Sequence, residues 1–148
     1  MYSRFNMKII IDVQKTNKVL SESVGEFKTK LLDQLAHNTK TLFEKNTPKK
    51  SGFGSRNYHV LKSLNTREIR NDTYYLPWVN DGTGIYGPLH HRITPKHAKV
   101  LHFYWKGNEW FLKSVKGQKG KHFVERSMTE VIRSVDSAVV IASRGTLK

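Results

Sequence analysis

Two neighbouring segments, Trp78-Val-Asn-Asp-Gly-Thr-Gly-Ile-Tyr-Gly-Pro88 and Ile93-Thr-Pro-Lys-His-Ala-Lys-Val-Leu-His-Phe-Tyr-Trp-Lys106, determine the fold expected for the middle of this chain. In the first segment a hydrophobic run ends at a glycine turn. A basic loop marked by prolines follows. The second segment continues as an aromatic strand over 99–105, because its side chains alternate between two faces. A tight connection over 106–108 then predicts a partner strand over 109–115.

Helical periodicity is found on both sides of this region. Between Leu20 and Leu42 apolar residues recur at steps of three, four and seven, which is the period of one helix face. Ser23 and Glu26 fit a capping box near its start, and Pro48 ends it because the residue before a proline avoids the helical conformation. A closing helix is predicted over 123–142. The two apolar stripes comprise Leu20, Val24, Phe27, Leu31, Leu35 and Leu42 in the first helix, and Val124, Met128, Val131, Val135 and Val139 in the second.

Strands complete the predicted architecture. Runs rich in β-branched and aromatic residues predict strands over 8–13, 60–70 and 73–79, the last two joined by a turn at Asn71-Asp72. The resulting fold class is α+β, with a long N-terminal helix packed on an antiparallel sheet and a C-terminal helix. The other sheet face is expected to stay partly open. Four aromatic side chains are expected to make subunit contacts there: Tyr74, Trp78, Tyr104 and Trp110.

Chain length and composition limit the remaining possibilities. The 148 residues predict a single domain over 1–148, with flexible loops at 46–58 and 82–95 and a frayed tail at 143–148. Cysteine is absent, which excludes disulfides and thiolate metal sites. No stretch approaches the ~20 apolar residues of a membrane span, so a soluble protein with no membrane partner is expected. The net charge of +14 favours nucleic acid, an anionic surface or an acidic protein as partner.

The histidines suggest two kinds of chemistry. Five of the seven lie between His90 and His122. The pairs His90-His91 and His97/His102 suggest a metal site, because imidazole is a common metal ligand. Metal binding is disfavoured because residues 88–106 contain no carboxylate and several cations. A metal-free ribonuclease is the better enzymatic hypothesis, although nothing in the sequence fixes a base beside a hydroxyl. Its candidate residues are His91, Arg92, Lys96 and His102.

The glycines and cations of the same region also suggest phosphate or nucleic-acid binding, but a structural role explains most of them. Gly82-Thr83-Gly84 lacks the spacing of a phosphate loop, and turns that need positive φ explain it better. Between His90 and Arg126 nine lysines or arginines alternate with aromatic residues. This mixture suits single-stranded nucleic acid, but an amphipathic hairpin with its aromatics inward is favoured. The sequence does not decide whether the lysines contact DNA or an acidic protein. The lysines concerned are Lys113, Lys116, Lys119 and Lys121.

Three segments resemble a known family. Asn46-Thr-Pro-Lys-Lys-Ser-Gly52 is similar to the family's ending of its long helix. Tyr75-Leu-Pro-Trp-Val-Asn-Asp-Gly-Thr-Gly-Ile-Tyr-Gly87 resembles its "Val-Glu-x-Gly-Thr-Gly-Ile-Tyr-Gly" motif, and Ile93 to Phe103 continues the match through Gln118. The family comprises the small head-to-tail connection proteins of long-tailed double-stranded DNA viruses, known as tail-completion, neck or minor tail proteins, with the lambda Z protein as a relative in fold. Three features depart from its pattern: Asn80, the longer loop at Phe53–Arg56, and Lys121-His-Phe-Val124, where Asn-Pro-Phe-Leu is common.

The resemblance implies a structural protein and no enzyme. Members form a ring, commonly six-fold, where the tail tube meets the head connector, and DNA passes through the lumen without a cofactor. It therefore implies a virion protein of the tail or neck, present in the host cytoplasm during assembly, with head-connector and tail-tube or tail-terminator proteins as neighbours. The assembly interface would include Trp78, Gly82, Thr83, Gly84, Tyr86, Arg92, Lys96, Tyr104 and Trp110. A basic nucleic-acid-binding module and a small ribonuclease are the alternatives.

Overall fold

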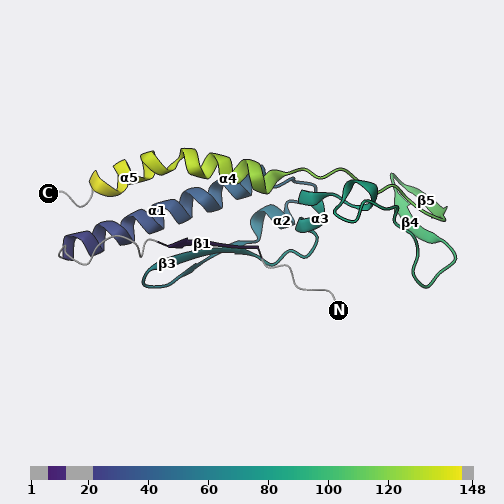
Figure 1. Cartoon of the computed structure of the whole chain (residues 1–148), viewed down its shortest axis with the longest axis horizontal. Helices are drawn as coiled ribbons and strands as arrows, with labels where there is room; N and C mark the ends of the chain where they lie inside the picture. The colour runs from purple at the N-terminus through teal and green to yellow at the C-terminus, as the bar shows by residue number, and fades with distance from the viewer. Residues whose placement is uncertain (1–6, 13–21, 145–148) are drawn as a thin grey trace. The chain divides into compact units, whose positions relative to one another are not determined.

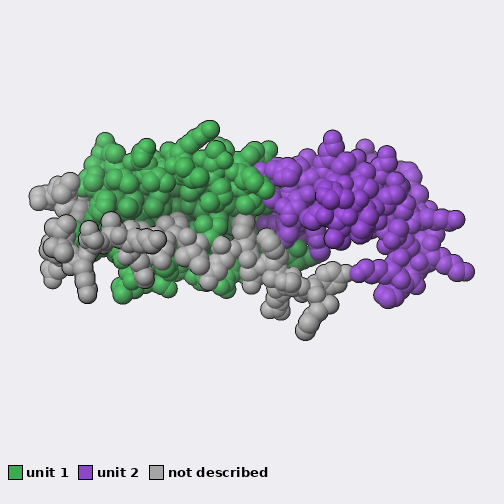
Figure 2. Space-filling view, viewed as in Figure 1, with its two compact units in different colours: residues 1–74, 123–148 green, residues 75–122 purple. Residues whose placement is uncertain are grey.

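The computed structural model describes residues 7–12 and 22–144, which fall into two compact units. Unit 1 comprises residues 1–74 and 123–148 and unit 2 comprises residues 75–122, as coloured in Figure 2. The fold class is confirmed as α+β, with a long N-terminal helix, two small antiparallel sheets and C-terminal helices. The division of the chain into one domain with flexible loops stays a prediction.

Helix α1 (Glu22–Asn46) forms the centre of unit 1 (Figure 1). It contacts β3 (Thr66–Asn71) and both C-terminal helices, α4 (Phe123–Arg133) and α5 (Val135–Arg144). The helix ends where predicted. It begins at Glu22, so Ser23 lies inside the helix instead of capping it.

The buried face of α1 differs from the predicted stripe. Phe27, Leu31, Leu35 and Leu42 are only half-buried, Val24 is exposed, and Leu20 lies outside the described residues. The fully buried side chains recur at helical spacing and include small or polar ones that an apolar count misses: Leu32, Ala36, Thr39, Phe43 and Thr47. Because α1 is covered both by the sheet and by α4 and α5, its buried face is wider than one stripe.

The sheet of unit 1 has the strand order β1-β3-β2, with every pair antiparallel. It consists of β1 (Met7–Asp12), β2 (Tyr58–Lys62) and β3, and Ile69 faces both Ile9 and Val60 in register. The single strand predicted over 60–70 is wrong, because the chain reverses at residues 63–65, where the Ser63 N–H donates to the Thr66 carbonyl at 3.0 Å. Serine and asparagine supply this turn, and the intervening Leu64 is 88% exposed.

Three further predicted elements need correction. The strand over 73–79 is wrong: helix α3 (Leu76–Asp81) forms there, because Pro77 occupies its first turn, where a missing N–H costs nothing. A short helix, α2 (Phe53–Arg56), lies within the predicted loop 46–58. The closing helix is two helices, since the chain breaks at Ser134, whose side chain donates to the Val131 carbonyl at 2.8 Å. Of the predicted tail, Ser143 and Arg144 belong to α5, and 145–148 lie outside the described residues.

The core of unit 1 combines apolar packing with one buried hydroxyl pair. Phe43 and Tyr58 meet edge to face with ring centroids 5.8 Å apart, beside Ala36 and Ile69. The Thr47 hydroxyl donates to the Phe43 carbonyl at 2.6 Å, so the Tyr58 hydroxyl donates to Thr47 across 2.8 Å. Burial raises the pKa of Tyr58 to about 12. Around this cluster pack Ile9, Val60, Val124, Met128 and Val131.

A buried cation joins the β2–β3 turn to α1. Arg67 is 4% exposed, and its Nε donates to the Asp33 carboxylate at 2.6 Å. Its Nη1 also donates to the carbonyls of Ser63 and Thr66. The hydrogen bond from Arg67 lowers the pKa of Asp33 below its ordinary value. This pair therefore fixes the turn against the helix only while Asp33 is ionised.

Asp33→Asn should destabilise the protein by about 1–2 kcal/mol at neutral pH, because the buried guanidinium loses its charged acceptor. Since the folded-state pKa of Asp33 is lowered, its contribution is complete above the ordinary value of 3.8 and is lost as pH falls through the lower folded value. Urea unfolding at a series of pH values should show the two proteins converging in acid. The Asn46–Glu130 hydrogen bond, which lowers the pKa of Glu130, is present in both proteins, so both keep some acid sensitivity. If the difference in unfolding free energy between the two proteins stayed constant down to the most acidic pH, Asp33 would not be the charged partner of Arg67.

Unit 2 contains α3, a short 3-10 turn over Gly84–Tyr86, and a hairpin of β4 (Leu101–Trp105) and β5 (Asn108–Leu112). The hairpin confirms the two aromatic strands, although β4 begins two residues later than predicted and β5 spans 108–112 instead of 109–115. Its register pairs Leu101 with Leu112 and Phe103 with Trp110. Lys106 and Gly107 both have positive φ, as a two-residue hairpin turn requires. The hairpin forms its own sheet. The expected single sheet with Tyr74, Trp78, Tyr104 and Trp110 on one open face is therefore wrong.

Candidate functional site

The Gly-Thr-Gly motif forms a close backbone contact inside unit 2. We call this contact the glycine crossing: residues 82–87 lie against residues 115–120. The N–H groups of Thr83 and Ile85 donate to the carbonyls of Gln118 and Lys116, at 2.8 and 2.9 Å. A Cβ on Gly84 would collide with the Lys116 carbonyl, and one on Gly117 with the Thr83 carbonyl. The glycines therefore permit two backbones to approach more closely than any side chain would allow.

Further backbone pairs extend the crossing on both sides. Ile93 and Val115 exchange two hydrogen bonds of 2.9 and 3.0 Å, and the Lys121 N–H donates to the Val79 carbonyl at 2.8 Å. Gly82 and Gly84 have φ of 87° and 65°, which confirms the turn interpretation of Gly82-Thr83-Gly84. The segment 82–95 is thus partly paired backbone. Its flexibility stays a prediction.

The hairpin exposes its aromatic residues instead of burying them. Tyr104 is 72% exposed, Phe111 59% and Trp105 56%. The expectation of an amphipathic hairpin with its aromatics inward is wrong, because a two-stranded sheet has too few neighbours in unit 2 to cover both faces. An exposed group of large apolar side chains on a small sheet marks an interaction surface.

One face of the hairpin forms the wall of a groove. Phe103, Trp105, Trp110 and Leu112 share this face by strand alternation and register. Residues 115–118 and Thr83, all part of the glycine crossing, form the other wall. The groove has a volume of about 510 Å³, within the range of small-ligand pockets. It is lined by Thr83, Phe103, Trp105, Trp110, Leu112, Val115, Lys116, Gly117 and Gln118.

The opposite face of the hairpin carries a polar cluster. Nε2 of His102 lies 2.6 Å from Oε1 of Glu109, and the Tyr104 hydroxyl donates to the same oxygen at 3.1 Å. The His102 ring stacks on Phe111 with centroids 4.5 Å apart. Glu109 was not among the residues predicted from the sequence. The connection predicted over 106–108 would pair Trp105 with Glu109, whereas the observed two-residue turn at Lys106-Gly107 pairs Tyr104 with Glu109.

Positive charge dominates unit 2. It contains eight lysines and arginines against two acids, Asp81 and Glu109. Lys106 Nζ lies 4.7 Å from the ring centroid of Trp105, and Lys119 Nζ lies 5.8 Å from that of Tyr86. Within this unit, all of which the structure describes, no lysine forms a salt bridge. The four lysines whose partner the sequence does not decide are all exposed: Lys113, Lys116, Lys119 and Lys121.

The remaining residues of the expected assembly interface are distributed over unit 2. Gly82, Thr83 and Gly84 belong to the glycine crossing, and Thr83 also lines the groove with Trp110. Tyr104 lies on the opposite hairpin face, and Trp78 is on α3. Tyr86 lies beneath Lys119, Arg92 Nε donates to the Ser114 hydroxyl at 2.8 Å, and Lys96 is exposed on the loop before β4. The structure thus joins Thr83 and Trp110 in one site.

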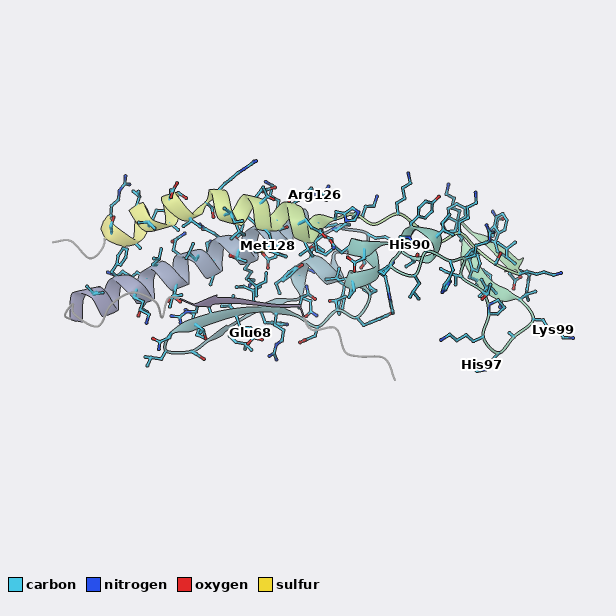
Figure 3. The ribbon with its side chains drawn as sticks, viewed as in Figure 1. Glu68, His90, His97, Lys99, Arg126 and Met128 are labelled. Atoms are coloured by element: carbon cyan, nitrogen blue, oxygen red, sulfur yellow. The ribbon has the colours of Figure 1, made fainter. Side chains whose placement is uncertain are left out.

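The histidines do not gather into a metal site. Among the described residues no group of three or more histidines and acids is placed to hold a metal ion. Figure 3 shows His97 on the loop before β4, apart from His90. His91 contacts the Arg92 carbonyl at 3.0 Å, whereas His102 contacts Glu109. Among the described residues no hydrogen bond joins the side chains of the four ribonuclease candidates to one another.

We expect a His91→Ala/His102→Ala double variant to behave like the unmodified protein toward single-stranded RNA, with no cleavage above a buffer control in either case. The reason is that the two histidines have different partners and share no contact. Incubation with a fluorescently labelled oligoribonucleotide and gel analysis tests this. Specific cleavage that disappears in the double variant would establish the ribonuclease alternative.

Comparisons with known proteins add no relative. No family model matches the chain, and neither a curated protein nor a solved structure does. None of the helices in the described residues is long and apolar enough to cross a membrane. The site therefore has to be interpreted from its own geometry.

Proposed function

We propose that this chain is a structural subunit of the head–tail junction of a tailed double-stranded DNA virus, where copies assemble as a ring. The observation that carries the proposal is the aromatic hairpin of unit 2. Its large apolar side chains are exposed on both faces, with Trp105 and Trp110 on one face and Tyr104 and Phe111 on the other. Side chains of this kind form the buried centres of protein interfaces. Assembly with neighbouring subunits is the simplest means of burying them.

The backbone pairing in unit 2 supports a role as a structural scaffold more than a role as an enzyme. The glycine crossing and the Ile93–Val115 pair hold the base of the hairpin through backbone hydrogen bonds. A preorganised base lowers the cost of ordering an interface when subunits meet. The resemblance of residues 46–52, 75–87 and 93–118 to head–tail connection proteins supports the same role, with no cofactor.

The charge of the chain sets a condition on this assembly. At +14, copies repel one another at low ionic strength. A ring therefore needs counter-ions, an acidic neighbouring ring of head-connector or tail-tube type, or DNA in its lumen. Under this proposal self-association increases with salt, because screening weakens the repulsion.

Electron microscopy of virions with labelled subunits tests the proposal. Label at the junction of head and tail is the expected result, and label found only in infected cells and never on particles would contradict it. A second measurement uses Phe111→Ala, which removes an exposed hairpin aromatic, with Leu64→Ala as the matched control. Leu64 is more exposed but lies in the β2–β3 turn of unit 1. Ring formation in sedimentation experiments should fall in the first variant and not in the second.

A further inference from the structure

We propose that the groove of unit 2 binds an acidic segment of a neighbouring protein, with an apolar side chain of that segment inserted between the hairpin and residues 115–118. The inference rests on the proposed function only in naming the neighbour as a junction protein. The groove itself and its chemistry belong to this chain. Three features carry the inference: the groove is preformed, it is positively charged, and its rings are not arranged for base stacking.

Both walls of the groove are fixed by backbone pairing. The hairpin wall is set by the β4–β5 register, and the second wall by the hydrogen bonds of Thr83 and Ile85 to residues 116 and 118. The Thr83 hydroxyl also accepts the Gln118 N–H at 3.1 Å. The groove therefore needs little reorganisation before a ligand enters. Its volume of about 510 Å³ accommodates a large apolar side chain together with the adjoining backbone.

The charge around the groove selects an acidic ligand. Lys116 is one of its lining residues, and Lys106 lies over the ring of Trp105, which is another. No carboxylate lines it. Of the two acids in unit 2, Glu109 bonds His102 and Tyr104 on the opposite hairpin face, and Asp81 accepts a hydrogen bond from Asn80. An acidic segment therefore complements the groove, whereas a basic segment is repelled.

The aromatic geometry favours a polypeptide over single-stranded nucleic acid. Base stacking uses open ring faces that follow one another along a strand. Here Trp105 and Trp110 meet at an interplanar angle of 60° with centroids 6.5 Å apart, and Lys106 occupies a position over Trp105. These rings line the groove at an angle to each other and do not form a platform for successive bases.

Isothermal titration calorimetry on the intact chain tests the proposal with short synthetic peptides. The probe carries glutamates on both sides of a central leucine. One control peptide replaces the leucine with serine, and a second replaces the glutamates with lysines. The first peptide should bind at least about tenfold more tightly than either control, because each control removes one of the two complementary features.

Variants locate the binding. Trp110→Ala and Lys116→Gln should each weaken the acidic peptide by about tenfold, and Lys116→Gln should also reduce the dependence of affinity on salt. Phe111→Ala, on the opposite face of the same hairpin, is the control and should bind the peptide normally. Because Lys116→Gln removes only a surface charge, it stays informative even where Trp110→Ala impairs folding.

Three outcomes overturn the inference. They are equal binding of all three peptides, tighter binding of a single-stranded DNA oligonucleotide that depends on Trp110, and self-association that is lost in Trp110→Ala and so assigns the groove to a second copy. Virion labelling is independent of these measurements. Labelled junctions with no peptide selectivity would refute the groove assignment alone, whereas peptide selectivity without label on particles would refute the junction role alone.

Discussion

Replacing Phe43 with alanine should lower the free energy of unfolding by about 3–5 kcal/mol, the range for large-to-small changes at buried aromatic sites. Phe43 has no exposed surface, and its ring packs against Tyr58 in the centre of unit 1. Its carbonyl also accepts the Thr47 hydroxyl, so the chain around it has little freedom to close the cavity. Urea unfolding followed by circular dichroism measures the change.

Phe53→Ala is the matched control for this prediction. The same atoms are removed, but Phe53 is 57% exposed at the start of α2, so the expected change is within about 0.5 kcal/mol. Phe27→Ala and Leu31→Ala, at half-buried positions of α1, should fall between the two. Equal losses at Phe43 and Phe53 would show that the buried face of α1 is assigned incorrectly.

The second large effect is expected at the glycine crossing. Gly84→Ala should destabilise the pairing of residues 83–85 with 116–118 by roughly 3 kcal/mol or more. The new Cβ would meet the Lys116 carbonyl, and a backbone atom cannot swing aside as the end of a side chain does. Hydrogen exchange of the Thr83 and Ile85 amides reports the opening directly, because both amides donate across the crossing.

Gly107→Ala separates the two causes of that loss, which are the steric collision of the new Cβ and the conformational penalty of positive φ. Gly107 also has positive φ, at 78°, but nothing lies within 4 Å of its Cβ position. Its substitution should therefore cost only the conformational penalty, about 1–2 kcal/mol, and leave the amides of Thr83 and Ile85 protected. A Gly84→Ala variant that exchanges no faster than Gly107→Ala would show that the crossing can open without cost.

Some of the site was predictable from the sequence, and the errors have physical causes. The hairpin followed from strand alternation and a tight turn, both local properties. The strand predicted over 73–79 failed because Pro77 also starts a helix well, and local pattern does not choose between the two outcomes. The aromatic residues were expected to point inward because sequence pattern gives alternation but does not show whether a second layer exists to cover a face.

The groove was beyond sequence reasoning for a similar reason. It unites Thr83 with residues 103–118, which are distant in the chain and meet only because glycines let two backbones cross. The glycine turn was identified, but no partner segment was predicted for it. Glu109 was missed as a partner of His102, because the connection predicted over 106–108 is one residue longer than the observed turn and places Glu109 on the other face of the hairpin.

By itself, the sequence determined the α+β class, the C-terminal end of α1, the aromatic hairpin and the positive φ of the Gly-Thr-Gly turn, because periodicity, turn chemistry and backbone sterics act over a few neighbouring residues. Only the tertiary structure decided which face of α1 is buried, since that depends on the sheet and on α4 and α5 covering it from different sides. It also decided that the hairpin stands as a separate sheet with exposed aromatics and that residues 82–87 pair with 115–120. Such contacts join residues far apart in the chain, and their energies depend on packing that no local pattern contains.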